Sequence, residues 1–230
     1  DAANTRVSNA QRREQQRERR RQQKDLQLAR KRNERAAERV QQERAMSDEQ
    51  KRERIERTKM QRVEQYQKMD DGMANGLRVV VDLAFAQDQT ERECNSIFKQ
   101  LGCAYGYMKK CPLDRVISLR VASYAGETAV RGRWHGLPQW KIHLHEEPIE
   151  SVYHPKDIIY LSPDADDVLL QLDANAVYVI GGIVDRSVRK GQSIGKASGN
   201  NYRAMRLPLQ ECMDVRKPVL NIDNVLITLN

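Results

Sequence analysis

An apolar run that breaks on two glycines and then presents a single carboxylate is the stretch of this chain best suited to chemistry. It reads Val177-Tyr-Val-Ile-Gly-Gly-Ile-Val-Asp-Arg-Ser187. Its first four residues have the β-forming character of a strand buried on both faces. Gly181 and Gly182 lack the Cβ atoms that would keep a ligand away from the backbone, and Asp185 would then lie beside that ligand. Glycine pairs after strands also form ordinary tight turns, so the neighbouring elements must decide.

Strand and helix signals alternate on both sides of this run. Strands are predicted at residues 77–85, 115–121, 140–144, 157–161, 204–207 and 219–222. Helices are predicted after the capping box Thr90-Glu-Arg-Glu93, through Val168, Leu169 and Leu172, over residues 192–198, and at the C-terminus. This alternation predicts an α/β fold with a parallel sheet.

Three consecutive predicted strands end in loops with residues suited to binding. These loops are Leu161-Ser-Pro-Asp164, Gly181-Gly182 and Leu207-Pro-Leu209. Ligands of open α/β sheets bind at the carboxyl ends of the strands, so we expect the three loops to converge. No G-x-G-x-x-G, GKS or GKT sequence occurs, which disfavours dinucleotide and ATP chemistry. The four cysteines have no CxxC spacing, so neither a metal site nor a disulfide framework is expected.

The positive charge of the chain is confined to its N-terminal third. Residues 1–70 hold 21 Lys and Arg against 13 Asp and Glu, a net charge of +8, whereas residues 71–230 hold 19 of each. A neutral body with a basic arm is typical of proteins that bind polyanions such as RNA. No window approaches 18 consecutive apolar residues, so no membrane role is expected.

The basic arm is predicted to be helical. Between Gln11 and Asp71 there is neither Gly nor Pro, and strong helix formers dominate. Ser47-Asp-Glu-Gln50 has the form of a capping box, which predicts a break or a restart of the helix there. The arginine clusters expected to contact phosphates are Arg12, Arg13, Arg19, Arg20 and Arg21. The turn signals Asp71-Gly72 and Asn75-Gly76 divide the chain into an extension, 1–76, and a domain, 77–230.

Several motifs in one order resemble the tRNA purine-N1 methyltransferases that modify the ninth nucleotide, the single-domain branch of the SPOUT superfamily. The motifs are the run 177–187, Lys190-Gly191, Lys196-Ala197, Arg206-Leu-Pro-Leu209, Val219-Leu-Asn-Ile-Asp-Asn-Val225, and upstream Val79-Val-Val-Asp-Leu, Lys99-Gln-Leu-Gly-Cys-Ala-Tyr105, Lys109-Lys110 and Asp157-Ile-Ile-Tyr-Leu-Ser-Pro-Asp164. The resemblance covers roughly residues 77 to 229. It implies a C-terminal trefoil knot that binds S-adenosyl-L-methionine, and tRNA as the partner.

The resemblance also implies roles for individual residues. Asp185 matches the carboxylate proposed to accept the N1 proton, and Gln100 and Asp82 match positions near the target pocket. Cofactor contacts are expected from Leu161, Ser162, Pro163, Gly181, Gly182, Asp185, Lys196, Leu207, Pro208, Leu209, Leu220, Asn221 and Asn224. RNA contacts are expected from Lys109, Lys110, Arg186 and Lys190 besides the arginines of the arm.

The chain departs from the family at three places. Asn200-Asn201 replaces the usual glycine before the Arg-Leu-Pro strand, Cys212 replaces an aromatic residue, and the chain stops at Asn230 where family members continue with another helix. The last departure suggests a truncated chain. The first residue is Asp1 rather than Met, so nucleus, cytoplasm and mitochondrion all stay open as the compartment.

Two classes of function fit these observations. The first is N1 methylation of a purine in tRNA, with guanine favoured over adenine, by a monomeric catalytic domain. The second is a non-catalytic RNA-binding or assembly subunit of a tRNA-processing or ribosome-associated complex, whose N-terminal helix binds a protein partner. The Gly-Gly-x-x-Asp sequence of residues 181–185 favours the enzyme, because a scaffold has no need of it.

Overall fold

The computed structural model describes residues 9–111, 116–184, 191–212 and 220–230, with side chains from Arg12 onward. The chain divides into two compact units, Asp1–Gln61 and Arg62–Asn230, and each is described by itself. This boundary assigns the end of the second long helix, from Arg62 onward, to the second unit. The predicted functional division between residues 76 and 77 stays a prediction.

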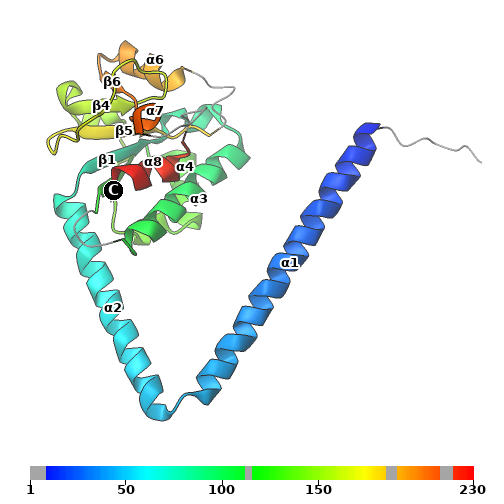
Figure 1. The fold of residues 1–230 in the computed structure, drawn as a ribbon. Coiled ribbons are helices and arrows are strands. Elements are labelled where there is room, and N and C mark those ends of the chain that lie inside the picture. The colour runs from blue at the N-terminus through cyan, green and yellow to red at the C-terminus, as the bar shows by residue number, and fades with distance from the viewer. Residues whose placement is uncertain (1–8, 112–115, 185–190, 213–219) are drawn as a thin grey trace, which may run out of the picture. The chain divides into compact units, whose positions relative to one another are not determined.

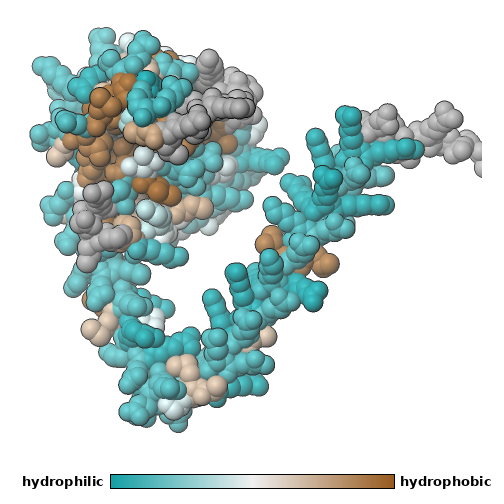
Figure 2. All heavy atoms as spheres, viewed as in Figure 1, coloured by the Kyte–Doolittle hydropathy of each residue, from teal (hydrophilic) through white to brown (hydrophobic). Residues whose placement is uncertain are grey.

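The first unit consists of charged helix. Helix α1 spans Asn9–Ala45 and helix α2 spans Asp48–Asn75, so the predicted break near Ser47 is confirmed. The Ser47 hydroxyl accepts a hydrogen bond from the Gln50 amide at 3.2 Å, and the Gln50 side chain accepts one from the Ser47 amide at 2.9 Å. The two bonds satisfy donors that a helix start leaves free. Figure 2 shows both helices as hydrophilic surface with scattered apolar residues.

The last turns of α2 belong to the second unit. Met69 and Lys68 are buried, and the helix continues through Asp71-Gly72, where the sequence had indicated a turn. A Cβ atom at Gly72 would overlap the Val116 side chain, so this glycine permits close packing instead of a turn. The helix does end at the second signal, where the Gly76 amide donates to the Gly72 carbonyl at 2.8 Å.

A six-stranded sheet forms the centre of the second unit (Figure 1). Its strands are β1 (Arg78–Asp82), β2 (Ser118–Ala122), β3 (His143–Leu144), β4 (Ile158–Leu161), β5 (Val177–Gly181) and β6 (Arg203–Met205). The order is β3-β2-β1-β5-β4-β6, and every neighbouring pair is parallel. The predicted parallel α/β sheet is therefore confirmed. All carboxyl ends of the strands lie at one edge.

Helices cover both faces of this sheet. They are α3 (Glu91–Met108), α4 (Gly126–Trp134), α5 (Ile149–Val152), α6 (Gln192–Gly199), α7 (Leu209–Cys212) and α8 (Ile222–Leu229), with short 3-10 helices η1 (Leu83–Asp88), η2 (Leu137–Gln139) and η3 (Pro155–Asp157). On one face Val79 and Val81 pack with residues of α3 and α8; on the other Val80 packs with Ala197 of α6. Helix α3 begins with the predicted capping box of Thr90 and Glu93.

Several elements differ from the predictions. The described part of the strand predicted at residues 219–222 is not a strand, because Asn221 is the N-cap of α8 and Ile222 begins that helix. None of the described residues between β4 and β5 forms the helix expected through Val168 and Leu169. The Leu169 amide instead donates to the Arg206 carbonyl, and the Arg206 amide donates to the Asp167 carbonyl, both at 2.8 Å. These bonds continue the pairing of β4 with β6, and a long-range pairing of this kind overrides local helix spacing. Conversely α4, α5 and α7 were not predicted; α4 and α5 have no side-chain cap at their starts, and α5 and α7 are single turns of four residues.

Candidate active site

The carboxylate of Asp82 lies at the centre of the strand ends. Its strand β1 is flanked by β2 and β5, and its side chain is 0% exposed. Four groups donate hydrogen bonds to it: Lys196 Nζ at 2.7 Å, Tyr160 Oη at 3.1 Å, the Ala84 amide at 3.0 Å and Ser123 Oγ at 3.4 Å. A buried carboxylate is stable only when it is bonded in this way. Asp82 thus joins β1 to β2, β4 and α6.

Lys196 supplies the opposite charge. It extends from α6, its side chain is 14% exposed, and Nζ also lies 4.0 Å from the Glu150 carboxylate. Tyr160 is fully buried on the same side; its burial, followed by the charge of Asp82, raises the pKa of the phenol well above its usual value. Tyr160 therefore stays protonated and acts as a donor to Asp82. The predicted contact of Lys196 with the cofactor stays a prediction beside this observed ion pair.

Ser123 adopts a backbone conformation that is uncommon outside glycine. Its φ angle is 57°, immediately after the end of β2. Its amide donates to the Glu147 carbonyl at 2.9 Å, and its hydroxyl points to Asp82. Non-glycine residues in this region are often found at functional sites, where the surrounding contacts hold them. Among the described residues the other one is Asn201, with a φ angle of 56°, at the position where the resemblance leads us to expect glycine.

The two glycines at the end of β5, Gly181 inside the strand and Gly182 directly after it, approach other protein atoms very closely. Gly181 pairs with Asp82 in the sheet, and the Gly182 amide donates to the Asp82 carbonyl at 2.8 Å. A Cβ atom at Gly182 would lie 2.8 Å from that carbonyl oxygen, and one at Gly181 would lie 2.9 Å from Ser193 Oγ. Packing of the chain against itself therefore requires glycine at position 182, where the close atom belongs to the backbone; at Gly181 the close atom is a side-chain hydroxyl that can rotate away. The approach of a ligand to these glycines, expected from the sequence, stays a prediction.

The three loops expected to converge do so, because β5, β4 and β6 are neighbours in that order. The Ser162 amide donates to the Met205 carbonyl at 2.9 Å, and the Gly191 amide donates to the Asp164 carboxylate at 3.2 Å. Among the residues expected to contact the cofactor, Leu161, Ser162, Gly181 and Gly182 are buried, while Pro163, Leu207, Pro208 and Leu209 are partly exposed.

The first residue of helix α8, Ile222, is hydrogen-bonded to Gln100. The Gln100 side-chain oxygen accepts a hydrogen bond from the Ile222 amide at 2.8 Å, at the start of α8. Leu220, Asn221 and Asn224, also expected to contact the cofactor, flank this amide in sequence. Gln100 and Asp82 approach from opposite sides, because α3 and α8 pack on the face of Val79, whereas Tyr160 and α6 lie on the face of Val80. Their common role at a target pocket stays a prediction.

Two buried side-chain oxygens, one in α8 and one in α6, accept no hydrogen bond from the described residues. Asp223 Oδ1, in the first turn of α8, has no hydrogen-bond partner among the described residues, and neither has Gln192 Oε1 at the start of α6. Buried acceptors of this kind normally meet a donor. An ammonium group and ribose hydroxyls are such donors, and S-adenosylmethionine carries both. The residues present therefore fit this cofactor.

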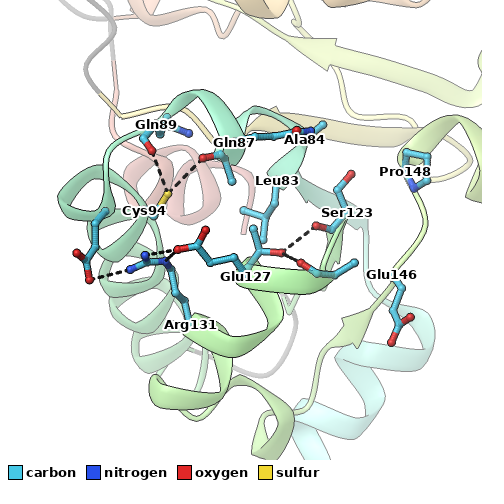
Figure 3. A pocket seen from close by; sticks show the side chains of 14 residues that line it. Leu83, Ala84, Gln87, Gln89, Cys94, Ser123, Glu127, Arg131, Glu146 and Pro148 are labelled. Carbon is cyan, nitrogen blue, oxygen red and sulfur yellow. Dashed lines mark hydrogen bonds and ion pairs between the residues drawn. The ribbon is translucent and has the colours of Figure 1, made fainter.

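A cavity of about 640 Å³ opens beside Ser123, under the carboxyl ends of β1 and β2 (Figure 3). Leu83, Gln89, Cys94 and Thr128 are among its lining residues. Arg131 also lines it, and its guanidinium pairs with Glu127 and with Glu91, the latter at 3.1 Å. Burial raises the pKa of the Cys94 thiol, so this cysteine stays protonated.

The residues expected to contact RNA are exposed wherever the structure describes them. Arg12, Arg13, Arg19, Arg20 and Arg21 are exposed on α1, and Lys109 and Lys110 are exposed after α3. Lys109 Nζ lies 5.1 Å from the centre of the Tyr105 ring. Asp185, Arg186 and Lys190 lie outside the described residues. Within the described ranges no three His, Cys, Asp or Glu side chains group as metal ligands, and no helix is long and apolar enough to cross a bilayer.

The family model described as tRNA (guanine(9)-N(1))-methyltransferase TRM10/TRM10A matches residues 4–229. The chain belongs to this family. It is 30% identical over 167 residues to tRNA methyltransferase 10 homolog B of Mus musculus, a match that covers 71% of this chain and 52% of the relative. The Homo sapiens homolog B is 27% identical over 168 residues, with the same coverage. The chain thus spans about half the length of these curated relatives.

Solved structures of the family share the fold. The structure described as a full-length spTrm10–SAH complex is 24% identical, with a TM-score of 0.59, and the match covers 67% of this chain and 84% of that one. A dual specific Trm10 from Thermococcus kodakaraensis is 21% identical, with a TM-score of 0.51 over 65% of this chain and 86% of that one. The predicted SPOUT-type α/β fold is therefore confirmed, and the trefoil knot stays a prediction.

Tyr160, Ser123 and Gln89 are site residues that the sequence did not reveal. Tyr160 carried a signal, because a tyrosine in a fully buried strand needs a partner for its hydroxyl. Ser123 and Gln89 carried none, since their roles depend on strands that are distant in sequence.

Proposed function

We propose that this protein methylates N1 of a purine at the ninth nucleotide of tRNA, with S-adenosyl-L-methionine as methyl donor and guanine as the preferred base. The match of the family model over residues 4–229 carries this proposal. The arrangement of the strand ends supports it, because the loops after β4, β5 and β6 lie at the same edge of the sheet. Near these loops, Lys196 and Tyr160 both donate hydrogen bonds to Asp82.

The chemistry requires removal of a proton. N1 of guanine carries a hydrogen at neutral pH and becomes a methyl acceptor only as that proton leaves. The cofactor supplies an electrophilic methyl group on a sulfonium. Asp185, which follows the described segment Gly181–Val184, is the residue that would accept the N1 proton or orient the base. A carboxylate is a weak base, so alignment of N1 with the methyl group contributes much of the rate.

Binding of the cofactor would use the loops at the carboxyl edge of the sheet. The backbone of Gly181 and Gly182, the segment 161–163 and the segment 207–209 would form its walls, and Asp223 would accept a hydrogen bond from it. Asp82 and Lys196 hold β1 and α6 together beneath these loops. The target purine must leave its stack to reach the site, which costs a few kcal/mol.

A methylation assay tests the proposal directly. The full chain should bind S-adenosylhomocysteine by calorimetry and should transfer a methyl group to a tRNA transcript with guanosine at position 9. Mass spectrometry of the nucleosides should identify N1-methylguanosine, and a transcript with adenosine at position 9 should react more slowly. If neither ligand binding nor methyl transfer occurs, the alternative of a non-catalytic assembly subunit replaces the enzyme.

The arginines of α1 should dominate the salt dependence of tRNA binding. Replacing Arg12, Arg13, Arg19, Arg20 and Arg21 by glutamine in the full chain should flatten the plot of log affinity against log salt, by about 0.7 to 0.9 for every phosphate that the variant no longer neutralises. Cofactor affinity should stay unchanged, because none of these arginines is among the residues expected to contact the cofactor. Filter binding at several salt concentrations measures the slope for tRNA, and calorimetry measures the cofactor affinity.

Five glutamine-to-alanine changes on the same helix provide the control. Gln15 and Gln16 lie between these arginines, Gln22, Gln23 and Gln27 follow them on the same helix, and replacing all five leaves the charge unaltered. If the arginine variant and this control gave the same slope, α1 would not bind RNA and would be left as a helix for a protein partner.

A further inference from the structure

Gln89 bonds to both sides of the backbone after the glycine pair. Its Nε2 donates to the Gly182 carbonyl at 2.6 Å, and its Oε1 accepts from the Val184 amide at 3.0 Å. A side-chain amide has one acceptor and two donors, so it can pair with a segment of backbone as a neighbouring strand would. Gln89 and this segment are 93 and 95 residues apart in sequence.

The two ends of the segment Gly181–Val184 are held in different ways. At the glycine end, sheet pairing with Asp82 fixes Gly181, and the Gly182 amide bonds to the Asp82 carbonyl. Beyond the glycines, the Ile183 amide donates to the Gly181 carbonyl at 2.8 Å and its side chain is buried. At the Val184 end, the Val184 backbone amide donates to Gln89 Oε1, and this is the hydrogen bond that the described residues provide for that amide.

Gln89 is itself held at a junction of two helices. The side-chain Nε2 also lies 3.3 Å from the Phe85 carbonyl oxygen. The backbone amide of Gln89 donates to the Ala86 carbonyl at 3.2 Å, because Gln89 is the C-cap of η1. The next residue, Thr90, is the N-cap of α3. The side chain lies at the wall of the cavity beside Leu83 and Cys94 (Figure 3). Because the ends of both helices are capped here, the Gln89 backbone forms a stable anchor.

We propose that Gln89 is a positioning residue for methyl transfer: its side-chain amide fixes the backbone of Gly182 and Val184, immediately before Asp185 in the sequence. This inference rests on the proposed function. It predicts a larger effect on turnover than on cofactor binding, since the glycine end keeps its bonds to β1 without Gln89. A displacement of about 1 Å at a reacting group can lower a rate by about 100-fold.

Replacing Gln89 by leucine tests the inference, because leucine is similar in size and makes neither hydrogen bond. At saturating tRNA and cofactor, kcat of the folded variant should fall by at least about tenfold. The Kd of S-adenosylhomocysteine should stay within about threefold by calorimetry. A Gln89→Leu variant with unchanged kcat overturns the inference, and so does one whose entire loss lies in cofactor affinity.

Replacing Gln89 by glutamate adds a readout that a purely structural role would not produce. An ionised glutamate still accepts from the Val184 amide, but it places a second acceptor against the Gly182 carbonyl, 2.6 Å away in the wild type. When protonated, it regains a donor for that carbonyl. The ratio of variant to wild-type kcat should therefore rise as the pH falls. A ratio that does not change with pH overturns the inference.

Gln87 offers matched controls, because it is exposed in η1 and lines the same cavity. Gln87→Leu and Gln87→Glu should keep the wild-type kcat and pH profile; if they lose as much as the Gln89 variants, the inference is overturned. Amide hydrogen exchange separates this inference from the proposed function. Faster exchange at Val184 in Gln89→Leu supports the positioning role even in a protein without methyl transfer, and unchanged exchange overturns it.

Discussion

Asp82→Asn is expected to lower the free energy of unfolding by about 3 to 5 kcal/mol, since it leaves the Lys196 ammonium largely buried without its carboxylate. The two charged groups are 2.7 Å apart, and Asp82 is inaccessible to solvent. The amide of asparagine has nearly the same size but carries no charge. Urea denaturation of both proteins, followed by circular dichroism, measures the difference.

Removing both charges should cost less than removing one. In the double variant Asp82→Asn with Lys196→Met, no unpaired charge remains, so its loss of stability should be smaller than the sum of the two single losses. A coupling energy near zero in this cycle would show that the ion pair does not stabilise the fold. Lys141→Met serves as the comparison, because its pair with Asp70 at 2.8 Å is partly exposed and should contribute at most about 1 kcal/mol.

Asp185→Asn should lower kcat by a factor between about 100 and 10,000, the range that general-base catalysis contributes. The substitution keeps the shape of the side chain and removes its basicity. The Kd of S-adenosylhomocysteine should stay within about threefold, since the bonds of the glycine pair to β1 are unaffected. Single-turnover methylation at several pH values measures the rate of methyl transfer, and calorimetry measures the affinity.

The control for this loss of charge is Asp166→Asn. Asp166 is exposed in the loop after β4, and its replacement should leave turnover unchanged. Unchanged turnover in Asp185→Asn as well would remove the proton-acceptor role. A loss of turnover with a pH profile parallel to that of the wild type would instead mean that Asp185 orients the base.

The sequence alone determined the elements whose signals are local. The capping boxes at Ser47 and Thr90 form as predicted, because their hydrogen bonds join residues three positions apart. The strands around Val80 and Val179 were visible because burial on both faces requires an unbroken apolar run. The convergence of the loops after β4, β5 and β6 also followed from the sequence, since parallel strands end at the same edge.

The tertiary structure alone decided how the polar side chains at that edge are bonded. Asp82 and Lys196 are 114 residues apart, and Gln89 is 95 residues from Val184, so no spacing in the sequence reveals either pair. The same reason explains the helix wrongly predicted at Val168, where pairing of backbone with Arg206 outweighs a local apolar pattern. Partners of this kind depend on the order of the strands in the sheet, which is a property of the whole fold.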